Sequence, residues 1–330
     1  MTARAILLTG AAGVVGQALL AELTGRPVIC LLRRGRLPAA GPEVVTGDIS
    51  RPSFGLPPEV YESLTRRVGT VIHSAALTEW GRPAEDYEGV NIAGTRHVID
   101  FARVAGASVH YISTAFVAAL AGEAPVRLRP DNVTTNYVLS KRASELLLAE
   151  SGVPHSVYRP TNLIGHSTTG WTSKPQIVQL VADWVGRGRA EVFPAHPGNL
   201  IDVVAQDLCA KAVAEAIRRD DVGRQFWLTY GKAAMTVDEA VELLIEHARS
   251  TGRRIRIPRI VHPADLDEAE LNALPPSSRR FVQVLGDVSE VTAASGGILP
   301  SSMSELVEEY GLPEIGDKDA FRRSLLAAAN

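Results

Sequence analysis

The sequence has few of the features that mark disulfide-rich, metal-binding or nucleic-acid-binding proteins. Its 330 residues include only two cysteines, Cys30 and Cys209, too few and too far apart for a disulfide framework or a zinc knuckle. No histidine pair stands at metal-ligand spacing beside an acid, so we expect no metal. A formal net charge of −3 argues against a nucleic acid as a partner. We therefore expect a chain of the reducing cytoplasm.

Long uninterrupted apolar runs are also missing. The most hydrophobic stretch, AILLTGAAGVVGQALLAEL, is broken by glycines and then by Gln17 and Glu22. This pattern argues against a signal peptide or a membrane span, and we expect no membrane association. With 45% hydrophobic and 22% charged residues, the chain has the composition of one large or two smaller globular domains. A homodimer is compatible with this composition.

Short apolar runs alternate with helix-period stretches through about residue 165. This alternation predicts an α/β fold, a Rossmann-type doubly wound parallel sheet. The expected strands are Ala5–Thr9, Pro27–Leu32, Glu43–Thr46, Thr70–His73, Ser108–Ser113 and Ser156–Arg159, and the expected helices between them are Gly13–Leu23, Pro58–Arg67, Asp86–Ala105 and Tyr137–Ser151.

The alternation ends after Gly165 in the polar loop GHSTTGWTSKP. We predict an NADP-binding Rossmann domain of residues 1–165 plus about 200–235, with strands near Leu200 and Phe226 completing the sheet. Residues of about 166–199 plus 236–330 form a smaller, mostly helical substrate-binding part. The segment Asp267–Arg280, which contains LPPSSRR, is expected to be mobile.

The first strand leads into a glycine-rich turn and an apolar helix. The turn TGAAGVVG carries Gly10, Gly13 and Gly16, and with Ala12, Val14 and Val15 it would direct backbone N–H groups at a dinucleotide pyrophosphate. The alternative is a tight β–α turn with no ligand.

The end of the second strand distinguishes between the two nicotinamide dinucleotides. An NAD site usually has an acid there, whereas VICLLRRGR ends in Arg33 and Arg34. A guanidinium can pair with the 2′-phosphate of NADPH, so we predict NADPH over NADH. The alternative is a solvated basic turn. Asp48, after the third strand, either meets the adenine amino group or caps a turn.

The segment NYVLSK places Tyr137 and Lys141 one turn apart on a helix face. Carbonyl reduction needs a proton donor, and a lysine ammonium beside a tyrosine favours its phenolate form. Ser113 and Thr114 follow a strand at the sheet edge where ligands bind, and there a hydroxyl can hold the substrate oxygen. Asn91 stands in the preceding helix, which it can bend while it holds a water beside the lysine.

The ordered motifs TGAAGVVG, VIHSAA, NIAGT, ISTAF, YVLSK and YRPTNLIG resemble those of the extended short-chain dehydrogenase/reductases. The run TGDISRPSFGLPPEVYESLTRRVGTVIHSAALTEW is most similar to the thioester reductase-like branch, which includes fatty acyl-CoA reductases and the reductase domains of peptide synthetases. The resemblance covers about residues 3–230 and is loose in the last hundred residues.

The resemblance implies roles for individual residues. Tyr137 is the proton donor, Lys141 adjusts its pKa, Thr114 rather than Ser113 orients the carbonyl, and Asn91 completes the relay. The implied NADP-binding residues are Gly10, Gly13, Gly16, Arg33, Arg34, Asp48, Ile49, Ser74, Ala75, Ala76, Lys141, Pro160, Asn162 and Leu163. Ser113, Phe116 and Trp171 are expected to contact the substrate, although Trp171 is equally well explained as a packing residue.

These observations predict an NADPH-dependent carbonyl reductase. Its substrate is an acyl thioester, bound to CoA or to a carrier, or a ketone or aldehyde of a larger metabolite such as a polyketide. One alternative is a nucleotide-sugar epimerase or dehydratase, which shares the fold and the Tyr-Lys pair. Dehydratases have an acid pair after the catalytic Thr, whereas Ala115 and Phe116 stand here. A second alternative is a non-catalytic NADP-binding sensor.

Overall fold

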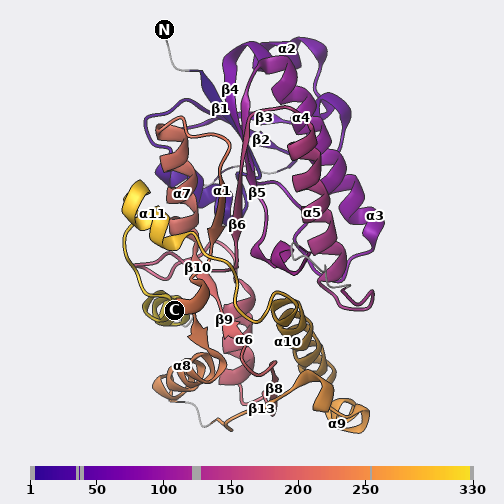
Figure 1. The fold of residues 1–330 in the computed structure, drawn as a ribbon, viewed down its shortest axis with the longest axis vertical. Helices are drawn as coiled ribbons and strands as arrows, with labels where there is room; N and C mark the ends of the chain where they lie inside the picture. The colour runs from indigo at the N-terminus through magenta and orange to yellow at the C-terminus, as the bar shows by residue number, and fades with distance from the viewer. Residues whose placement is uncertain (1–3, 35–36, 38–40, 121–127, 253–254, 328–330) are drawn as a thin grey trace.

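A computed structural model describes residues 4–34, 37, 41–120, 128–252 and 255–327 of the chain. It contains a seven-stranded sheet in the order β11-β6-β5-β4-β1-β2-β3, in which every pair of neighbours is parallel (Figure 1). The strands are β1 (Ala5–Thr9), β2 (Val28–Leu32), β3 (Glu43–Thr46), β4 (Val68–His73), β5 (Ser108–Ile112), β6 (His155–Pro160) and β11 (Gln225–Leu228). The predicted fold class is confirmed.

Helices cover both faces of this sheet, which explains why the central strands β5, β4 and β1 are largely buried. On one face α1 (Val14–Glu22) packs against α7 (Gln206–Arg218), and side chains of β1, β2 and α7 share one core. On the other face α2 (Pro58–Arg67), α4 (Ala93–Ala105) and α5 (Thr135–Glu150) lie against a second core. β1 is buried along its whole length.

The helix expected at Asp86–Ala105 is present but irregular. It is built from α3 (Ala84–Tyr87), a π-helical turn over Glu88–Ile92 and then α4. Asn91 lies within the π-helical turn. Such turns are uncommon and often mark functional sites, because they redirect side chains that a regular helix would place elsewhere.

The expectation that a strand near Leu200 completes the sheet is wrong, whereas the strand at Phe226 is confirmed. β9 (Leu200–Ile201) pairs antiparallel with β12 (Met235–Thr236) outside the main sheet. The strand after it, β10 (Val203–Ala205), pairs with β7 (Asn162–Ile164). The chain thus leaves the sheet after β6 and returns only at β11.

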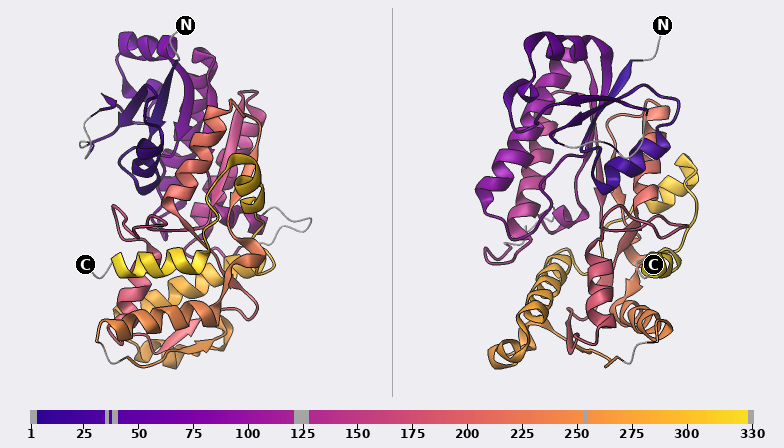
Figure 2. Two further views of the ribbon diagram at one scale, coloured as in Figure 1. Left: turned by 90° about the vertical axis from the view of Figure 1, so that its left-hand side faces the viewer. Right: turned by 180° about the vertical axis from the view of Figure 1, so that it is seen from behind.

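Most of the remaining chain forms a helical unit below the sheet (Figures 1 and 2). Its elements are α6 (Ile177–Gly186), α8 (Val237–Ser250), α9 (Glu268–Ala273), α10 (Pro276–Ala294) and α12 (Asp317–Ala327), together with the short parallel pair β8 (Val192–Pro194) and β13 (Arg259–Val261). The segment Asp267–Arg280 forms α9 and the start of α10, and its mobility stays a prediction. Its Asp267 side chain caps α9 by accepting a hydrogen bond from the Glu270 backbone N–H.

The proposed division into two domains remains a prediction. That division places α11 (Met303–Tyr310) in the substrate-binding part, but its Leu306 and Tyr310 pack in the same core as α7, on the nucleotide-binding side. In the described part of the chain, none of the helices combines the length and the apolar character that crossing a bilayer requires.

Candidate active site

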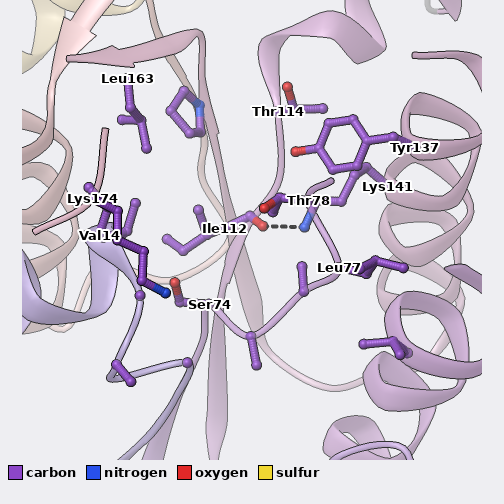
Figure 3. Close-up of a pocket in the computed structure, with 18 of the residues that line it drawn as sticks. Val14, Ser74, Leu77, Thr78, Ile112, Thr114, Tyr137, Lys141, Leu163 and Lys174 are labelled. Atoms are coloured by element: carbon purple, nitrogen blue, oxygen red, sulfur yellow. Dashed lines mark hydrogen bonds between the residues drawn. The ribbon is translucent and has the colours of Figure 1, made fainter. Parts of the chain in front are cut away.

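A cavity of about 760 Å³ opens at the carboxyl ends of the strands. This is the edge where open parallel sheets bind ligands. The predicted site residues that line it are Gly10, Ala12, Gly13, Val14, Val15, Arg33, Arg34, Asp48, Ile49, Ser74, Ala75, Ala76, Ser113, Thr114, Phe116, Tyr137, Lys141, Pro160, Asn162 and Leu163. Figure 3 shows Thr114, Tyr137 and Lys141 on one side of this space and Val14, Leu163 and Lys174 on the other. Gly16, Asn91 and Trp171 are not among the described lining residues.

The glycine-rich turn allows three backbone segments to approach closely. A Cβ on Gly10, whose φ is +75°, would lie 2.5 Å from the backbone nitrogen of Ala75 after β4. A Cβ on Gly16 would lie 2.2 Å from the Gly10 carbonyl oxygen, so Gly16 serves the packing of α1 on the turn. Gly13 is the N-cap of α1 and has no side chain to occupy the first N–H groups. The end of the helix is therefore open to an anion.

We expect Gly10→Ala to destabilise the protein and to weaken NADPH binding at least tenfold. Gly25→Ala is the matched control, because Gly25 also has a positive φ, +80°, but its Cβ would meet no atom within 4 Å. The left-handed conformation alone costs about 1–2 kcal/mol, and Gly10→Ala adds the clash with Ala75. Urea unfolding and NADPH titration measure both effects. If Gly10→Ala and Gly25→Ala lose the same free energy of unfolding and both bind NADPH with unchanged affinity, this account of the turn is contradicted.

At the outer end of the cavity, Arg33 and Arg34 are exposed at the end of β2. Asp48 also lines the cavity, and its Oδ1 accepts hydrogen bonds from the backbone N–H of Ser50 at 2.9 Å and its hydroxyl at 2.7 Å. Burial would raise the pKa of Asp48, but the Ser50 hydrogen bonds and the charges of Arg33 and Arg51 together lower it. Asp48 is therefore an ionised turn residue that faces the cavity.

Tyr137 and Lys141 lie at the inner end of the cavity, on the first two turns of α5 (Figure 3). Burial raises the pKa of Tyr137 to about 12, with the Thr114 hydroxyl opposing this through a hydrogen bond. Burial lowers the pKa of Lys141 to about 7. The Lys141 Nζ donates to the Ile112 carbonyl at 2.6 Å and lies 4.3 Å from the centre of the Tyr111 ring. The tyrosine is therefore protonated, and the lysine is held at the end of β5.

Asn91 lies behind these two residues. Its Oδ1 accepts a hydrogen bond from the Leu77 N–H at 2.7 Å, and its Nδ2 donates to the Leu77 carbonyl at 3.1 Å and to the Ser140 Oγ at 2.9 Å. The side chain thus ties the loop after β4 to the turn of α5 between Tyr137 and Lys141. Its backbone carbonyl accepts from the Thr95 and Ser144 hydroxyls. In this structure Asn91 positions the site through protein contacts.

Two further residues line the cavity. From the sequence, Ser113 takes second place to Thr114, and Lys174 is not among the predicted site residues. The Ser113 Oγ is buried and has no hydrogen-bond partner among the described residues, which leaves it available to a ligand. Lys174 lies in the polar loop before α6, on the same side of the cavity as Val14, and in Figure 3 its side chain points toward Ser74. No motif surrounds it in the sequence. Trp171, by contrast, is 57% exposed and lies outside the cavity lining.

The parallel sheet, the glycine turn at its edge and the Tyr137–Lys141 pair define an NAD(P)-dependent oxidoreductase of the extended short-chain dehydrogenase/reductase class. Residues 39–213, more than half of the chain, match the Male sterility protein family, and the chain belongs to that family. The predicted family and enzyme class are thereby confirmed. Membership of an enzyme class argues against the alternative of a non-catalytic NADP-binding sensor.

Among curated proteins, the chain is 27% identical over 251 residues to glycine betaine reductase ATRR of Emericella nidulans, covering 64% of this chain and 20% of that protein. It is 31% identical over 237 residues to an isonitrile lipopeptide synthase of Streptomyces coeruleorubidus, covering 62% of this chain and 16% of that protein. The chain thus spans a fifth or less of the length of these relatives.

Among solved structures, the terminal R domain of the myxalamid PKS-NRPS pathway is 25% identical, with a TM-score of 0.76 over 100% of this chain and 91% of that chain. The Bordetella bronchiseptica enzyme WbmH, solved with NAD+, is 18% identical with a TM-score of 0.68 over 99% of both chains. The likeness to WbmH shows the fold alone.

Proposed function

We propose that this protein is an NADPH-dependent reductase of acyl thioesters, presented on a carrier or on CoA, with Tyr137 as the proton donor. The observation that carries the proposal is the protonated Tyr137 hydroxyl at the inner end of the cavity, beside Thr114 and Lys141. The full-length likeness to a terminal R domain favours a thioester over a ketone. The nucleotide-sugar alternative has support at the level of the fold alone, from a UDP-glucose 4-epimerase of Thermotoga maritima that is 18% identical with a TM-score of 0.64.

The cavity residues fit an extended dinucleotide. Gly10 lets the backbone after β4 approach the turn, no side chain caps the N-terminal end of α1, and the exposed Arg33 and Arg34 line the outer end of the cavity. Pro160, Asn162 and Leu163 line the inner end, where the nicotinamide would lie close to Tyr137. When bound, NADPH supplies a hydride to the carbonyl carbon of the substrate.

The chain's own residues handle the oxygen of the carbonyl. Thr114 holds the oxygen, and Tyr137 transfers its phenolic proton to it as the carbonyl carbon gains the hydride. The product of this step is a hemithioacetal. Its C–S bond then breaks, the thiol leaves with a proton, and the aldehyde remains. The Lys141 ammonium stabilises the phenolate that Tyr137 becomes, and solvent returns the proton. The net change is one thioester, one NADPH and one proton to one aldehyde, one thiol and one NADP+.

The pH dependence of the reaction is expected to follow Lys141. Because burial lowers the pKa of Lys141 to about 7, its ammonium is present below about pH 7 and is lost above it. We expect kcat/KM for NADPH to fall about tenfold for each pH unit above that value. Tyr137, with a pKa raised to about 12, does not titrate in this range.

The control for this titration is Lys141→Arg. The arginine guanidinium stays charged over this pH range. We therefore expect kcat/KM of the variant for NADPH to be independent of pH at about pH 7–9, whatever its absolute value. A wild-type profile that is equally flat would contradict the assignment to Lys141.

The proposed function is tested by offering the purified protein an acyl-CoA, the matching aldehyde and a bulky aromatic ketone, and following the loss of NADPH absorbance. We expect oxidation with the acyl-CoA. Turnover of the ketone alone would make the protein a ketoreductase and would overturn the thioester proposal.

A further inference from the structure

A second chamber of about 90 Å³ lies beyond the inner end of the main cavity. The two spaces share Phe116, Thr161, Asn162 and Ile177, which form the neck between them. Beyond the neck the walls come from α6, α8 and α10, which Figure 1 shows below the sheet. The apolar wall residues include Val181, Phe193, Ala240, Leu244, Leu285 and Phe321. The chamber thus adjoins the main cavity at Phe116, on the side of Thr114 and Tyr137.

The polar side chains around this chamber are already bonded within the protein. Asn199 Nδ2 donates to the Ser289 carbonyl at 2.7 Å. The two carboxylate oxygens of Asp202 accept the N–H groups of Tyr230 at 3.1 Å and Gly231 at 2.8 Å. A polar ligand group that entered the chamber would lose its hydrogen bonds to water without gaining others, which costs free energy. An apolar group loses no hydrogen bonds when it moves from water into the chamber.

The polar side chains of the neck are also hydrogen-bonded within the protein. Thr161 Oγ1 and Asn162 Nδ2 both donate to the Asp202 backbone carbonyl, at 3.0 and 3.3 Å. Their donors are therefore turned away from the passage between the two spaces. Asp202 also lines the chamber, and burial raises its pKa to about 7. None of the described lining residues is basic, so a second anion would find no opposite charge there.

We propose that this chamber binds the acyl chain of the substrate and selects a short, uncharged aliphatic chain. The inference rests on the proposed function and adds the substrate class to it. The size of the chamber sets the upper limit, because an apolar cavity of about 150 Å³ accommodates a benzene ring and this one is smaller. The first carbons after the carbonyl pass the neck at Phe116, and the next few carbons fill the chamber.

The test is a series of acetyl, hexanoyl and dodecanoyl pantetheine thioesters, with adipoyl as the anionic counterpart of hexanoyl. Each buried methylene is expected to raise kcat/KM about fourfold, so the value rises steeply from acetyl to hexanoyl and not further at dodecanoyl. The terminal carboxylate of adipoyl should lower kcat/KM at least about 30-fold. Equal values for acetyl and hexanoyl, or a preference for adipoyl, would overturn the proposal.

Two variants that change the chamber in opposite directions sharpen this test. Ala240→Leu fills the chamber and should abolish the advantage of hexanoyl over acetyl in kcat/KM. Leu244→Ala enlarges it and should move the optimum to a longer chain. NADPH affinity and the thermal unfolding temperature show that each variant folds. An unchanged hexanoyl-to-acetyl ratio in both folded variants would place the acyl chain elsewhere.

The same series of aldehydes separates this inference from the thioester proposal. If no thioester is reduced but the aldehydes show the same length preference, the chamber assignment stands and the thioester assignment fails. If thioesters of every length are reduced equally, the thioester assignment stands and the chamber assignment fails. Failure of both series overturns both.

Discussion

Replacing Tyr137 by phenylalanine is expected to lower kcat for thioester reduction by about 10³-fold while NADPH binds with unchanged affinity. General acid catalysis typically contributes about 10²–10⁴-fold, and no other acid stands at this position in the described part of the cavity lining. The ring of phenylalanine preserves the packing of Tyr137 against Tyr87, whose ring centre lies 6.3 Å away. Single-turnover kinetics with saturating NADPH measure the effect on the chemical step.

Tyr87→Phe is the matched control. Tyr87 is as deeply buried, and its hydroxyl donates to the Glu79 carbonyl outside the cavity lining. We expect its removal to lower stability by about 1 kcal/mol and to leave kcat within about threefold. Comparable losses of kcat in the two variants would show that Tyr137 acts through packing and not as a proton donor.

The second large effect concerns the choice of cofactor. Arg33→Met is expected to weaken NADPH binding about 10–100-fold and to leave NADH binding nearly unchanged, because a charge-assisted hydrogen bond to the 2′-phosphate is worth about 1.5–3 kcal/mol. Arg33 and Asp48 both line the outer end of the cavity, and the charge of Arg33 helps to lower the pKa of Asp48. Fluorescence titration with both cofactors measures the ratio.

Lys174→Met provides the contrast. Its side chain lies on the same side of the cavity as Val14 and points toward Ser74, where the glycine turn would hold the pyrophosphate that both cofactors share (Figure 3). We therefore expect NADPH and NADH to lose affinity by the same factor, about tenfold, and Lys174→Arg to retain most of it. If Arg33→Met lowers both affinities equally, Arg33 does not contact the 2′-phosphate. If Lys174→Met changes neither, the lysine does not contact the cofactor.

The parts of the fold that the sequence predicted well are those specified locally. β1, the glycine turn and α1 follow one another within a few residues, and α5 carries Tyr137 and Lys141 on a single face. The register of neighbouring strands then brings Ser113 and Ser74 to the same edge as Gly10. Periodicity and turn chemistry were sufficient there.

The errors arose where distant segments decide the outcome. Leu200 lies in an apolar run that could join any sheet, and its strand partner Thr236 is far along the chain. Lys174 has no motif around it, and only the folded loop brings its side chain over the cavity. The walls of the second chamber come from α6, α8 and α10. In the sequence, the apolar faces of these helices cannot be told from faces that pack in a hydrophobic core.

The most direct test of the central claim is the transfer of label from NADPH carrying deuterium at its reactive position to hexanoyl pantetheine, followed by mass spectrometry of the products. The account predicts hexanal, or hexanol after a second reduction, with deuterium at the former carbonyl carbon, free thiol in equal amount to the product, and no product with Tyr137→Phe in the same time. Release of thiol together with unlabelled hexanoate would show hydrolysis without reduction and would contradict it.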